Sequence, residues 1–327
     1  MAERPDRAAG SALLNDAAGH VPCSICGGSC LVLFRVLDIN RRTSAESFEY
    51  RKCQCCGVVF LKDPPADNRP YYRGNYFSPP KSLSQLQRYA RRNHPKLEIV
   101  RKFATGGRLL EVGPGIGSFA WLAKAAGFQV EAIEQDERAC AYLKNIVGVD
   151  VCRTSTPERT LASTKRRYDV VALWHAIEHL PNPWSMLSQS VRVLNDGGIL
   201  VIATPNPSSW QFKKLGPGWP HLDAPRHLWL MPLETMSHHL ESLGAPLVWA
   251  TTDDADGRSW NRFGWSQWIL NFAPDVIGST LLAKAIARGA GYVIAATVRP
   301  WESVELSGSA YTAVFRKRAG ASHQRTT

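Results

Sequence analysis

Two pairs of cysteines near the start of the chain have the spacing of a metal site. Cys23 and Cys26 form one Cys-x-x-Cys pair, and Cys53 and Cys56 form a second. A turn of this kind directs two thiolates to one side of an ion, and two such turns complete the tetrahedron that zinc prefers. Four cysteine ligands would leave the ion no open position, so the spacing predicts a structural Zn²⁺ in a small zinc ribbon.

The neighbouring Cys30 and Cys55 leave the choice of ligands open. Cys53 or Cys55 could combine with Cys56 in different ways, and an iron–sulfur cluster is an alternative to zinc. Disulfides are disfavoured, because residues 1–20 carry charges and no apolar run and so do not resemble a secretory signal. We therefore expect a cytoplasmic protein.

A glycine-rich turn further along the chain is the second feature with chemical meaning. The short apolar strand expected at Arg108–Val112 runs into Gly113, Gly115 and Gly117, and a helix is expected to follow. Glycines let the backbone turn tightly and approach a ligand closely. The spacing differs from the Gly-x-Gly-x-x-Gly of dinucleotide sites, and Pro114 removes an amide donor that a pyrophosphate would use.

Two carboxylates accompany this turn. Glu111 stands two residues before Gly113, where it would oppose phosphates and favour a cationic amino-acid ligand. Glu134 follows the second expected strand, Gln129–Ile133. A carboxylate at that strand end can accept both ribose hydroxyls of an adenosine. The turn and the two acids together predict a site for a nucleoside that carries a cationic amino-acid group.

Strands and helices alternate after residue 107, as in a parallel sheet with crossover helices. We expect an α/β fold, a Rossmann-like, mostly parallel seven-stranded sheet with helices on both faces, preceded by the small zinc ribbon. The expected strands are 108–112, 129–133, 149–152, 169–174, 199–203, 247–250 and 311–316, and the expected helices are 119–126, 136–146 and 186–194.

Composition divides the chain further. We expect a disordered leader (1–20), a zinc-binding module (21–62), a linker and helical cap (63–104), a catalytic domain (105–318) with an insertion (258–300), and a flexible tail (319–327). The insertion is rich in Trp and aliphatic residues. Its apolar run is interrupted by Lys284 and Arg288, so an amphipathic or buried helix is favoured over a membrane span. A substrate lid, a peripheral membrane contact and plain packing stay open.

Several segments resemble the class I S-adenosylmethionine-dependent methyltransferases. Residues 108–136 resemble their cofactor site. Residues 168–183 resemble the fourth-strand segment of the type 11/12/23-like subgroup, which contains the ubiquinone-pathway O-methyltransferases. The segments that match the same subgroup elsewhere are 194–200, 204–209 and 225–228. The resemblance covers roughly residues 105–250.

The resemblance implies S-adenosylmethionine as cofactor. Glu111 and the three glycines would surround its methionine part, Glu134 would hold the ribose, and Trp174 with His175 would line the floor near the sulfonium. The residues implied to bind the cofactor are Glu111, Gly113, Gly115, Gly117, Glu134, Gln135, Trp174 and His175.

Methyl transfer from a sulfonium is an in-line displacement, so the enzyme mainly aligns the acceptor and removes its proton. Histidine suits proton removal near neutral pH. The candidates lie in loops beyond the expected fourth and fifth strands, and they are His175, Glu178, His179, His221 and His227. His179 and His227 lie inside the matched segments and are preferred. The alternative is that Glu178 and His179 only cap and orient their loop.

Three further residues are candidates for contact with the acceptor. Tyr72 and Tyr76 could close over it, although tyrosines in such linkers also serve as packing. Arg226 could hold a substrate phosphate. The zinc module followed by Pro-Tyr-Tyr resembles sugar methyltransferases of antibiotic and polysaccharide pathways, which implies a small-molecule, sugar or lipid-linked acceptor.

The net charge of +11, from 39 Lys and Arg against 28 Asp and Glu, favours an anionic acceptor or partner. An RNA base methyltransferase is the first alternative, but the fourth strand lacks the Asn/Asp-Pro-Pro-aromatic sequence, so nucleic acid is disfavoured. A zinc-dependent interaction protein with an inactive methyltransferase domain is the second, and a nicotinamide oxidoreductase the third. O- and C-methylation both stay open, as does the oligomeric state.

Overall fold

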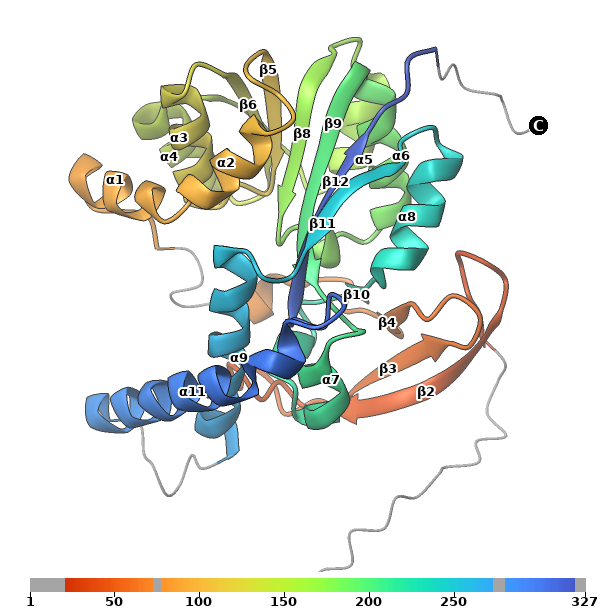
Figure 1. Ribbon diagram of the computed structural model, residues 1–327, viewed down its shortest axis with the longest axis vertical. Coiled ribbons are helices and arrows are strands. Elements are labelled where there is room, and N and C mark those ends of the chain that lie inside the picture. Colours follow the sequence, from red (N-terminus) through yellow and green to blue (C-terminus); the bar gives the residue numbers. More distant parts are fainter. Residues whose placement is uncertain (1–20, 73–77, 273–279, 321–327) are drawn as a thin grey trace, which may run out of the picture.

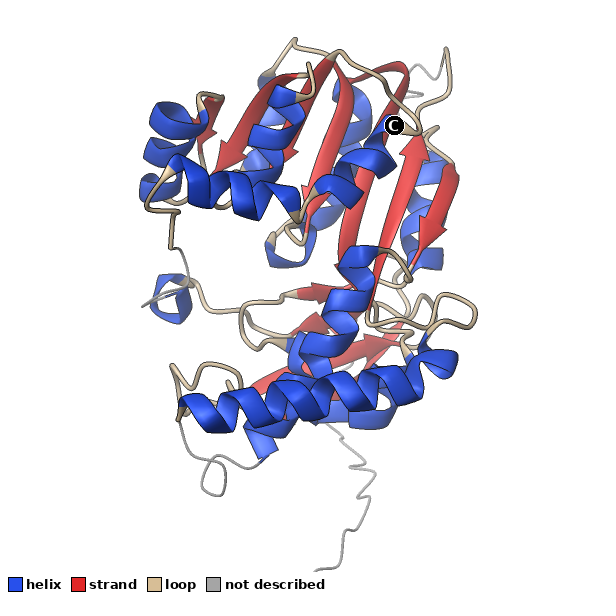
Figure 2. Cartoon of the chain, turned by 60° about the vertical axis from the view of Figure 1, so that its left-hand side comes forward, coloured by secondary structure: helices blue, strands red, loops and turns tan. Residues whose placement is uncertain are grey.

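The computed structural model describes residues 21–72, 78–272 and 280–320. The expected leader 1–20, Tyr76 and most of the expected tail, residues 321–327, lie outside these ranges. Two sheets organise the molecule, one of seven strands and one of five (Figures 1 and 2). The pair of helices α9 (Ala255–Phe272) and α11 (Leu281–Glu302) lies at the same end as the smaller sheet.

The seven-stranded sheet confirms the predicted fold. Its spatial order is β11-β12-β9-β8-β5-β6-β7. β12 runs antiparallel to both of its neighbours, β9 and β11, and all other neighbouring pairs are parallel. In chain order the strands are β5 (Arg108–Val112), β6 (Gln129–Glu134), β7 (Asp150–Arg153), β8 (Tyr168–Trp174), β9 (Leu194–Pro205), β11 (Leu247–Thr251) and β12 (Ala310–Arg316).

Helices cover both faces of this sheet, and each face has its own buried core (Figure 1). One face carries α1 (Leu83–Arg91), α2 (His94–Arg101), α3 (Ser118–Ala125) and α4 (Glu137–Tyr142). The other carries α5 (Pro157–Ser163), α6 (Pro183–Val193) and α8 (Leu233–Ser242). The central strand β8 is almost wholly apolar, as expected where helices bury a parallel strand from both sides.

Two elements differ most from the sequence expectation. The fifth strand begins at Leu194 instead of 199, because Leu194 pairs with Tyr168 of β8 and the Gly197–Gly198 turn bonds Lys317 just after β12. The helix expected over 136–146 divides into α4 and a π-helical turn, Leu143–Val147, which ends at Gly148 with a positive φ. Neither difference moves a candidate site residue.

The smaller sheet is antiparallel throughout, in the order β1-β2-β3-β4-β10. Its strands are β1 (Val21–Pro22), β2 (Ser29–Val36), β3 (Phe48–Cys53), β4 (Val59–Leu61) and β10 (Trp229–Leu230). The first four belong to the N-terminal module, residues 21–62. β10 comes from the catalytic domain and pairs with β4. Part of the catalytic domain is therefore built into the sheet of the N-terminal module.

Residues 219–230, here called the histidine loop, contain the 3-10 turn Pro220–Leu222 and β10. A buried core joins this loop to the module, and its members include Tyr50, Val59, Trp219 and Leu228. The hydroxyl of Tyr50 donates a hydrogen bond to the carbonyl of His227 at 2.6 Å. The module therefore helps to fix the backbone that carries His221, Arg226 and His227.

The helices α9 and α11 lie between β11 and β12 in the chain, beside the shorter helix α7 (Trp210–Leu215). They correspond to the expected insertion 258–300 with slightly wider bounds, since β11 ends at Thr251, α9 begins at Ala255 and α11 ends at Glu302. Within the described residues, α11 is the one helix long and apolar enough to cross a membrane by length and composition.

Candidate active site and metal centre

The glycine turn and Glu134 meet at the carboxyl ends of β5 and β6. The Glu134 carboxylate accepts hydrogen bonds from the backbone N–H groups of Gln135 (2.7 Å), Asp136 (3.0 Å) and Gly115 (3.2 Å). These bonds hold the carboxylate in one orientation at the end of its strand. Each carboxylate oxygen has about two acceptor sites, so the oxygen bonded to Gly115 keeps one site for a hydroxyl group of a ligand.

The three glycines of this turn all have positive φ, between +55° and +70°. A Cβ at Gly117 would lie 2.4 Å from Leu143 Cδ2, so a side chain there would disrupt the packing of α3 on the π-helical turn. A Cβ at Gly115 would meet no atom within 4 Å. The glycine at 117 is thus needed for packing, whereas Gly115 borders open space next to Glu134.

Glu111 supplies a second carboxylate beneath this turn. It is buried, and its Oε2 has no hydrogen-bond partner among the described residues. Burial raises the pKa of Glu111 to about 8, and Lys96 opposes that shift while Glu134 adds to it. A buried acceptor of this kind fits a cationic group such as the ammonium of a methionine moiety, which would restore the charged carboxylate.

Trp174, at the end of β8, forms the wall next to this site. Its ring packs edge-on against Phe119, and the ammonium of Lys96 lies 5.0 Å from its ring centre. Lys96 Nζ also lies 3.3 Å from Asp256 Oδ1 in α9. One lysine from the helical cap therefore connects the end of β8 with α9.

His175 occupies the next position, with a left-handed φ of 52°. Its Nε2 lies 2.6 Å from Asp256 Oδ2, its Nδ1 lies 3.7 Å from Glu178 Oε1, and its ring stacks on Trp260 with centroids 4.0 Å apart. Burial acts to lower the pKa of His175, but the two carboxylates outweigh it and the pKa is raised. His175 is therefore held between two acids that favour its protonated form, and a ring that already carries this proton cannot take one from an acceptor.

His179 and His227 lie edge to face, with ring centroids 4.7 Å apart. His179 Nδ1 is 2.9 Å from the carbonyl of Arg226, and His227 Nδ1 is 2.8 Å from the carbonyl of His221. A carbonyl can only accept, so Nδ1 carries a proton in each ring, and in the neutral ring of His179 the free electron pair is on Nε2. Burial, with His227 close by, lowers the pKa of His179 to about 4, which keeps this ring neutral.

Glu178 lies beneath both histidines and is fully buried. Its Oε2 accepts a hydrogen bond from Thr204 at 3.1 Å. Burial favours the protonated form, but the three neighbouring histidines prevail and lower the pKa of Glu178 to about 2. Donor atoms of Glu178, His179 and His227 lie within 4.8 Å of one another. This cluster could accept a proton or bind one divalent ion.

The residues expected to contact an acceptor have separate positions. The Tyr72 hydroxyl lies 3.1 Å from His179 Nδ1, so Tyr72 borders the histidine cluster. Arg226 is fully buried, and its guanidinium bonds both Asp38 and Asp223 in a network between the module and the histidine loop. The guanidinium also donates to the carbonyls of Tyr71 and Ala224, so its nitrogens all bond protein groups.

Lys96 and Asp256 are two site residues that the sequence did not predict. Both are more than three-quarters buried, and they reach His175 and Trp174 from elements far apart in the chain. One signal was available for Asp256. The acidic segment Thr251–Asp256 directly follows an expected strand, where polar residues often serve a site.

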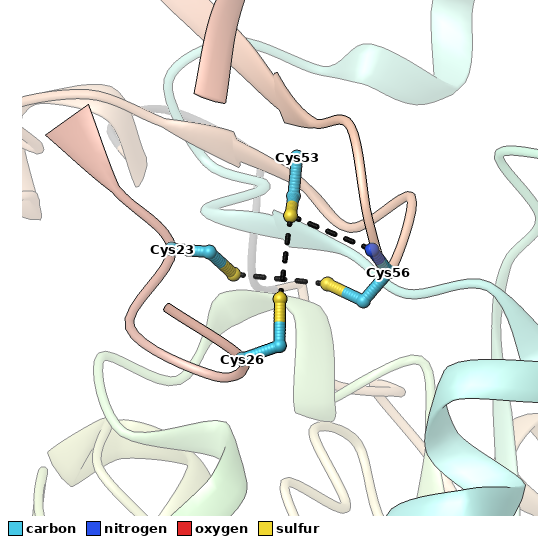
Figure 3. A group of neighbouring side chains, drawn as sticks. All are labelled: Cys23, Cys26, Cys53 and Cys56. Carbon is cyan, nitrogen blue, oxygen red and sulfur yellow. Dashed lines mark hydrogen bonds between the residues drawn. The ribbon is translucent and has the colours of Figure 1, made fainter. Parts of the chain in front are cut away.

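The four cysteines expected to bind zinc form one cluster at the tips of two hairpins (Figure 3). The sulfurs of Cys23 and Cys56 are 3.7 Å apart, and those of Cys26 and Cys53 are 3.5 Å apart. Zinc about 2.3 Å from each sulfur would hold the sulfurs roughly 3.8 Å apart. The spacing fits a tetrahedral zinc site, and Cys55 is exposed and outside the cluster.

Comparison with known proteins agrees with this arrangement. A family model described as a methyltransferase domain matches residues 82–248, about half of the chain. A ubiquinone biosynthesis O-methyltransferase of Caulobacter vibrioides is 33% identical over 102 residues, which are 30% of this chain and 40% of that protein. A probable S-adenosylmethionine-dependent methyltransferase of Mycobacterium tuberculosis is 33% identical over 99 residues, 30% of this chain and 35% of that protein.

The chain spans less than half the length of these two curated relatives. Among solved structures, a phosphoethanolamine N-methyltransferase 2 of Haemonchus contortus superposes with a TM-score of 0.50 at 14% identity, covering 92% of this chain and 71% of that one. That likeness concerns the fold. The family match, together with the glycine turn and Glu134, places the chain among the class I S-adenosylmethionine-dependent methyltransferases.

Proposed function

We propose that the protein transfers the methyl group of S-adenosylmethionine to a hydroxyl or acidic carbon of a small-molecule acceptor. The observation that carries this proposal is the position of the neutral ring of His179, in edge contact with His227, one strand away from the glycine turn and Glu134. S-adenosylmethionine would supply a methyl carbon on a sulfonium, and an aligned nucleophile would attack this carbon as the neutral thioether leaves. The chain must then align the acceptor and take its proton.

We assign the proton acceptor to His179. Its Nε2 carries a free electron pair, and His179 is less buried than His227, so an acceptor molecule can reach it. The carbonyl of Arg226 fixes the tautomer, and Glu178 stabilises the imidazolium that forms. The Tyr72 hydroxyl lies next to the same nitrogen, Nδ1, and helps to hold the ring in place. His175, paired with Asp256, serves as a positioning residue at the end of β8.

The acceptor class follows from the relatives and from charge. The curated relatives named above include ubiquinone biosynthesis O-methyltransferases, which favours oxygen as the methylated atom. The net charge of +11 favours an anionic acceptor such as a sugar phosphate or a lipid-linked sugar. The site is walled by α9, Tyr72 and the histidine loop, which suits a small molecule better than a base within a nucleic acid.

The cysteine cluster would hold a structural zinc ion. Its four thiolates complete the coordination of such an ion, so the ion would take no part in the chemistry. We infer that the ion stabilises the fold of the N-terminal module, on which the histidine loop packs.

His179→Ala is expected to lower kcat by about 100-fold to 10,000-fold, because removal of a general base has effects of this size. Binding of S-adenosylmethionine should stay within twofold of wild type, since His179 does not belong to the glycine turn. Turnover of wild type should hold from pH 7 down to about pH 5 and fall only below, since a base with a pKa of about 4 stays neutral there.

An acid limb near pH 6.5, the ordinary range of histidine, would contradict the assignment of the base to His179. His238→Ala, at a histidine outside the site on α8, is the matched control and should keep full turnover. Stimulation of the zinc-loaded enzyme by added Mg²⁺ or Mn²⁺ would instead assign the Glu178–His179–His227 cluster to an ion.

A further inference from the structure

Apart from Glu302 at its end, helix α11 buries a narrow face of small residues against neighbouring helices. Ala283, Ala287, Gly291 and Ala295 recur every fourth residue on this face. A Cβ at Gly291 would lie 2.7 Å from the backbone nitrogen of Ser266, so α11 and α9 are in backbone contact. The contact with α9 therefore involves the small side chains, and the large apolar side chains lie on other faces of α11.

The opposite face of α11 points to solvent on the outside of the molecule (Figures 1 and 2). Leu282 is 70% exposed, Ile286 58% and Val293 66%. With roughly 100° between successive residues, this face carries no charged residue. Its members are Leu282, Ala285, Ile286, Gly289, Val293, Ala296 and Pro300. We call them the apolar face of α11, and exposed apolar surface of this extent marks an interaction site.

A cavity of about 220 Å³ borders this face, between α9 and α11. Three arginines line it, Arg258, Arg262 and Arg299, and Ala296 belongs to both the cavity and the apolar face. Arg258 and Arg299 share the carboxylate of Asp253, at 3.6 and 3.5 Å.

The remaining charges around the cavity are also mostly basic. Arg262 lies 5.3 Å from the ring centre of Tyr292. The acid Glu302 is buried and accepts a hydrogen bond from Trp265, and burial raises the pKa of Glu302. Lys284 and Arg288 extend the same flank of α11. The cavity and flank therefore favour an anionic group, with apolar surface directly beside it.

We propose that the apolar face of α11 docks on an anionic lipid bilayer, with a lipid headgroup phosphate in the arginine-lined cavity. A helix with one apolar face and a basic flank lies in the plane of a membrane interface. Anionic headgroups attract Lys and Arg, and guanidinium groups bind phosphate oxygens in a bidentate manner. The small-residue contact with α9 keeps α11 on the protein surface in this arrangement.

The same pair of helices reaches the active site, because α9 carries Asp256 and Trp260 against His175. A docked α11 would therefore bring the α9 side of the active site toward the bilayer. Binding to a membrane does not depend on the methyl acceptor, so it is testable without turnover, and its failure would leave the proposed methyl transfer untouched.

The test is flotation of the zinc-loaded full chain with vesicles of phosphatidylcholine alone or mixed with phosphatidylglycerol. Wild type should bind the mixed vesicles and bind the neutral vesicles more weakly. The double variant Ile286→Glu, Val293→Glu should bind the mixed vesicles about 100-fold more weakly, since it removes two apolar side chains that would enter the bilayer. Arg262→Gln should weaken binding to mixed vesicles by about fivefold.

Ile146→Glu is the matched control, because Ile146 is 50% exposed on the π-helical turn, away from α11. It should bind as wild type does. Absence of binding by folded wild type, or equal binding by the double variant, would overturn the proposal. The proposal would also be overturned if wild type bound no vesicles and formed a concentration-dependent dimer that the double variant lacks. That result would assign the apolar face of α11 to contact with a second copy of the chain. Saturable binding of inorganic phosphate without vesicle binding would reduce the cavity to a soluble-phosphate site and also overturn the proposal.

Discussion

Cys53→Ser is expected to yield a protein without zinc and with turnover lowered by at least about 100-fold. Cys53 is fully buried in the cluster, and its loss leaves three ligands. Structural zinc contributes about 10–16 kcal/mol in zinc-finger peptides, which is as much as the whole stability of many domains. Without the ion the module should unfold and release β10 and the histidine loop, which carries His227.

Binding of S-adenosylmethionine should survive this substitution better than turnover does, because Glu134 and the glycine turn lie on the other side of β8. Metal content, calorimetric titration and turnover measured on one preparation separate the two effects. Cys55→Ser is the matched control, since Cys55 is exposed and outside the cluster, and it should retain one zinc ion and full turnover. Full activity of zinc-free Cys53→Ser protein would refute the link between module and active site.

Arg226→Met is expected to lower the free energy of unfolding by about 3–5 kcal/mol. The substitution keeps the length of the side chain but leaves Asp38 and Asp223 without their buried cation, and breaking a buried pair from one side has an effect of this size. Asp38 is 2% exposed and holds Arg226 at 2.7 Å, so water cannot replace the guanidinium. Urea denaturation at neutral pH gives the measurement.

Arg35→Met provides the comparison, because Arg35 forms an exposed ion pair with Glu49 and such pairs contribute about 0–1 kcal/mol. The result also decides between two roles of Arg226. A structural link predicts lower stability, whereas the phosphate contact suggested by the sequence predicts a raised KM with unchanged stability. The second outcome would require Arg226 to leave its network and face the acceptor.

The cofactor site could be predicted from sequence because its residues follow one another along two βα units. The glycine turn, Glu111 and Glu134 lie within 24 residues, and strand–turn–helix alternation positions them. The cysteine cluster was predictable for a similar reason, since each Cys-x-x-Cys turn is a local structure. The seven-stranded sheet followed from apolar runs that alternate with helices.

Long-range contacts escaped prediction. β10 has two residues, Trp229 and Leu230, and so short a strand carries no periodic signal. Its pairing with β4 across about 170 residues joins the module to the catalytic domain. The pairing of His175 with Asp256 depends on the placement of α9, which packing decides and no local pattern specifies. The strand β3 was not predicted either, because its segment Glu49–Lys52 is rich in charged residues. These side chains face solvent or form ion pairs.

Calorimetric titration of the zinc-loaded protein is the first test of whether the chain is an S-adenosylmethionine-dependent methyltransferase. S-adenosylmethionine should bind with micromolar affinity, NADH should not bind, and Glu134→Ala should weaken binding of S-adenosylmethionine at least about tenfold, since a charged hydrogen-bond acceptor contributes about 1.5–3 kcal/mol. Glu137→Ala, at an exposed carboxylate one turn away on α4, should leave binding unchanged. If folded, zinc-loaded protein bound NADH, or bound no S-adenosylmethionine at all, the chain would not be an S-adenosylmethionine-dependent methyltransferase.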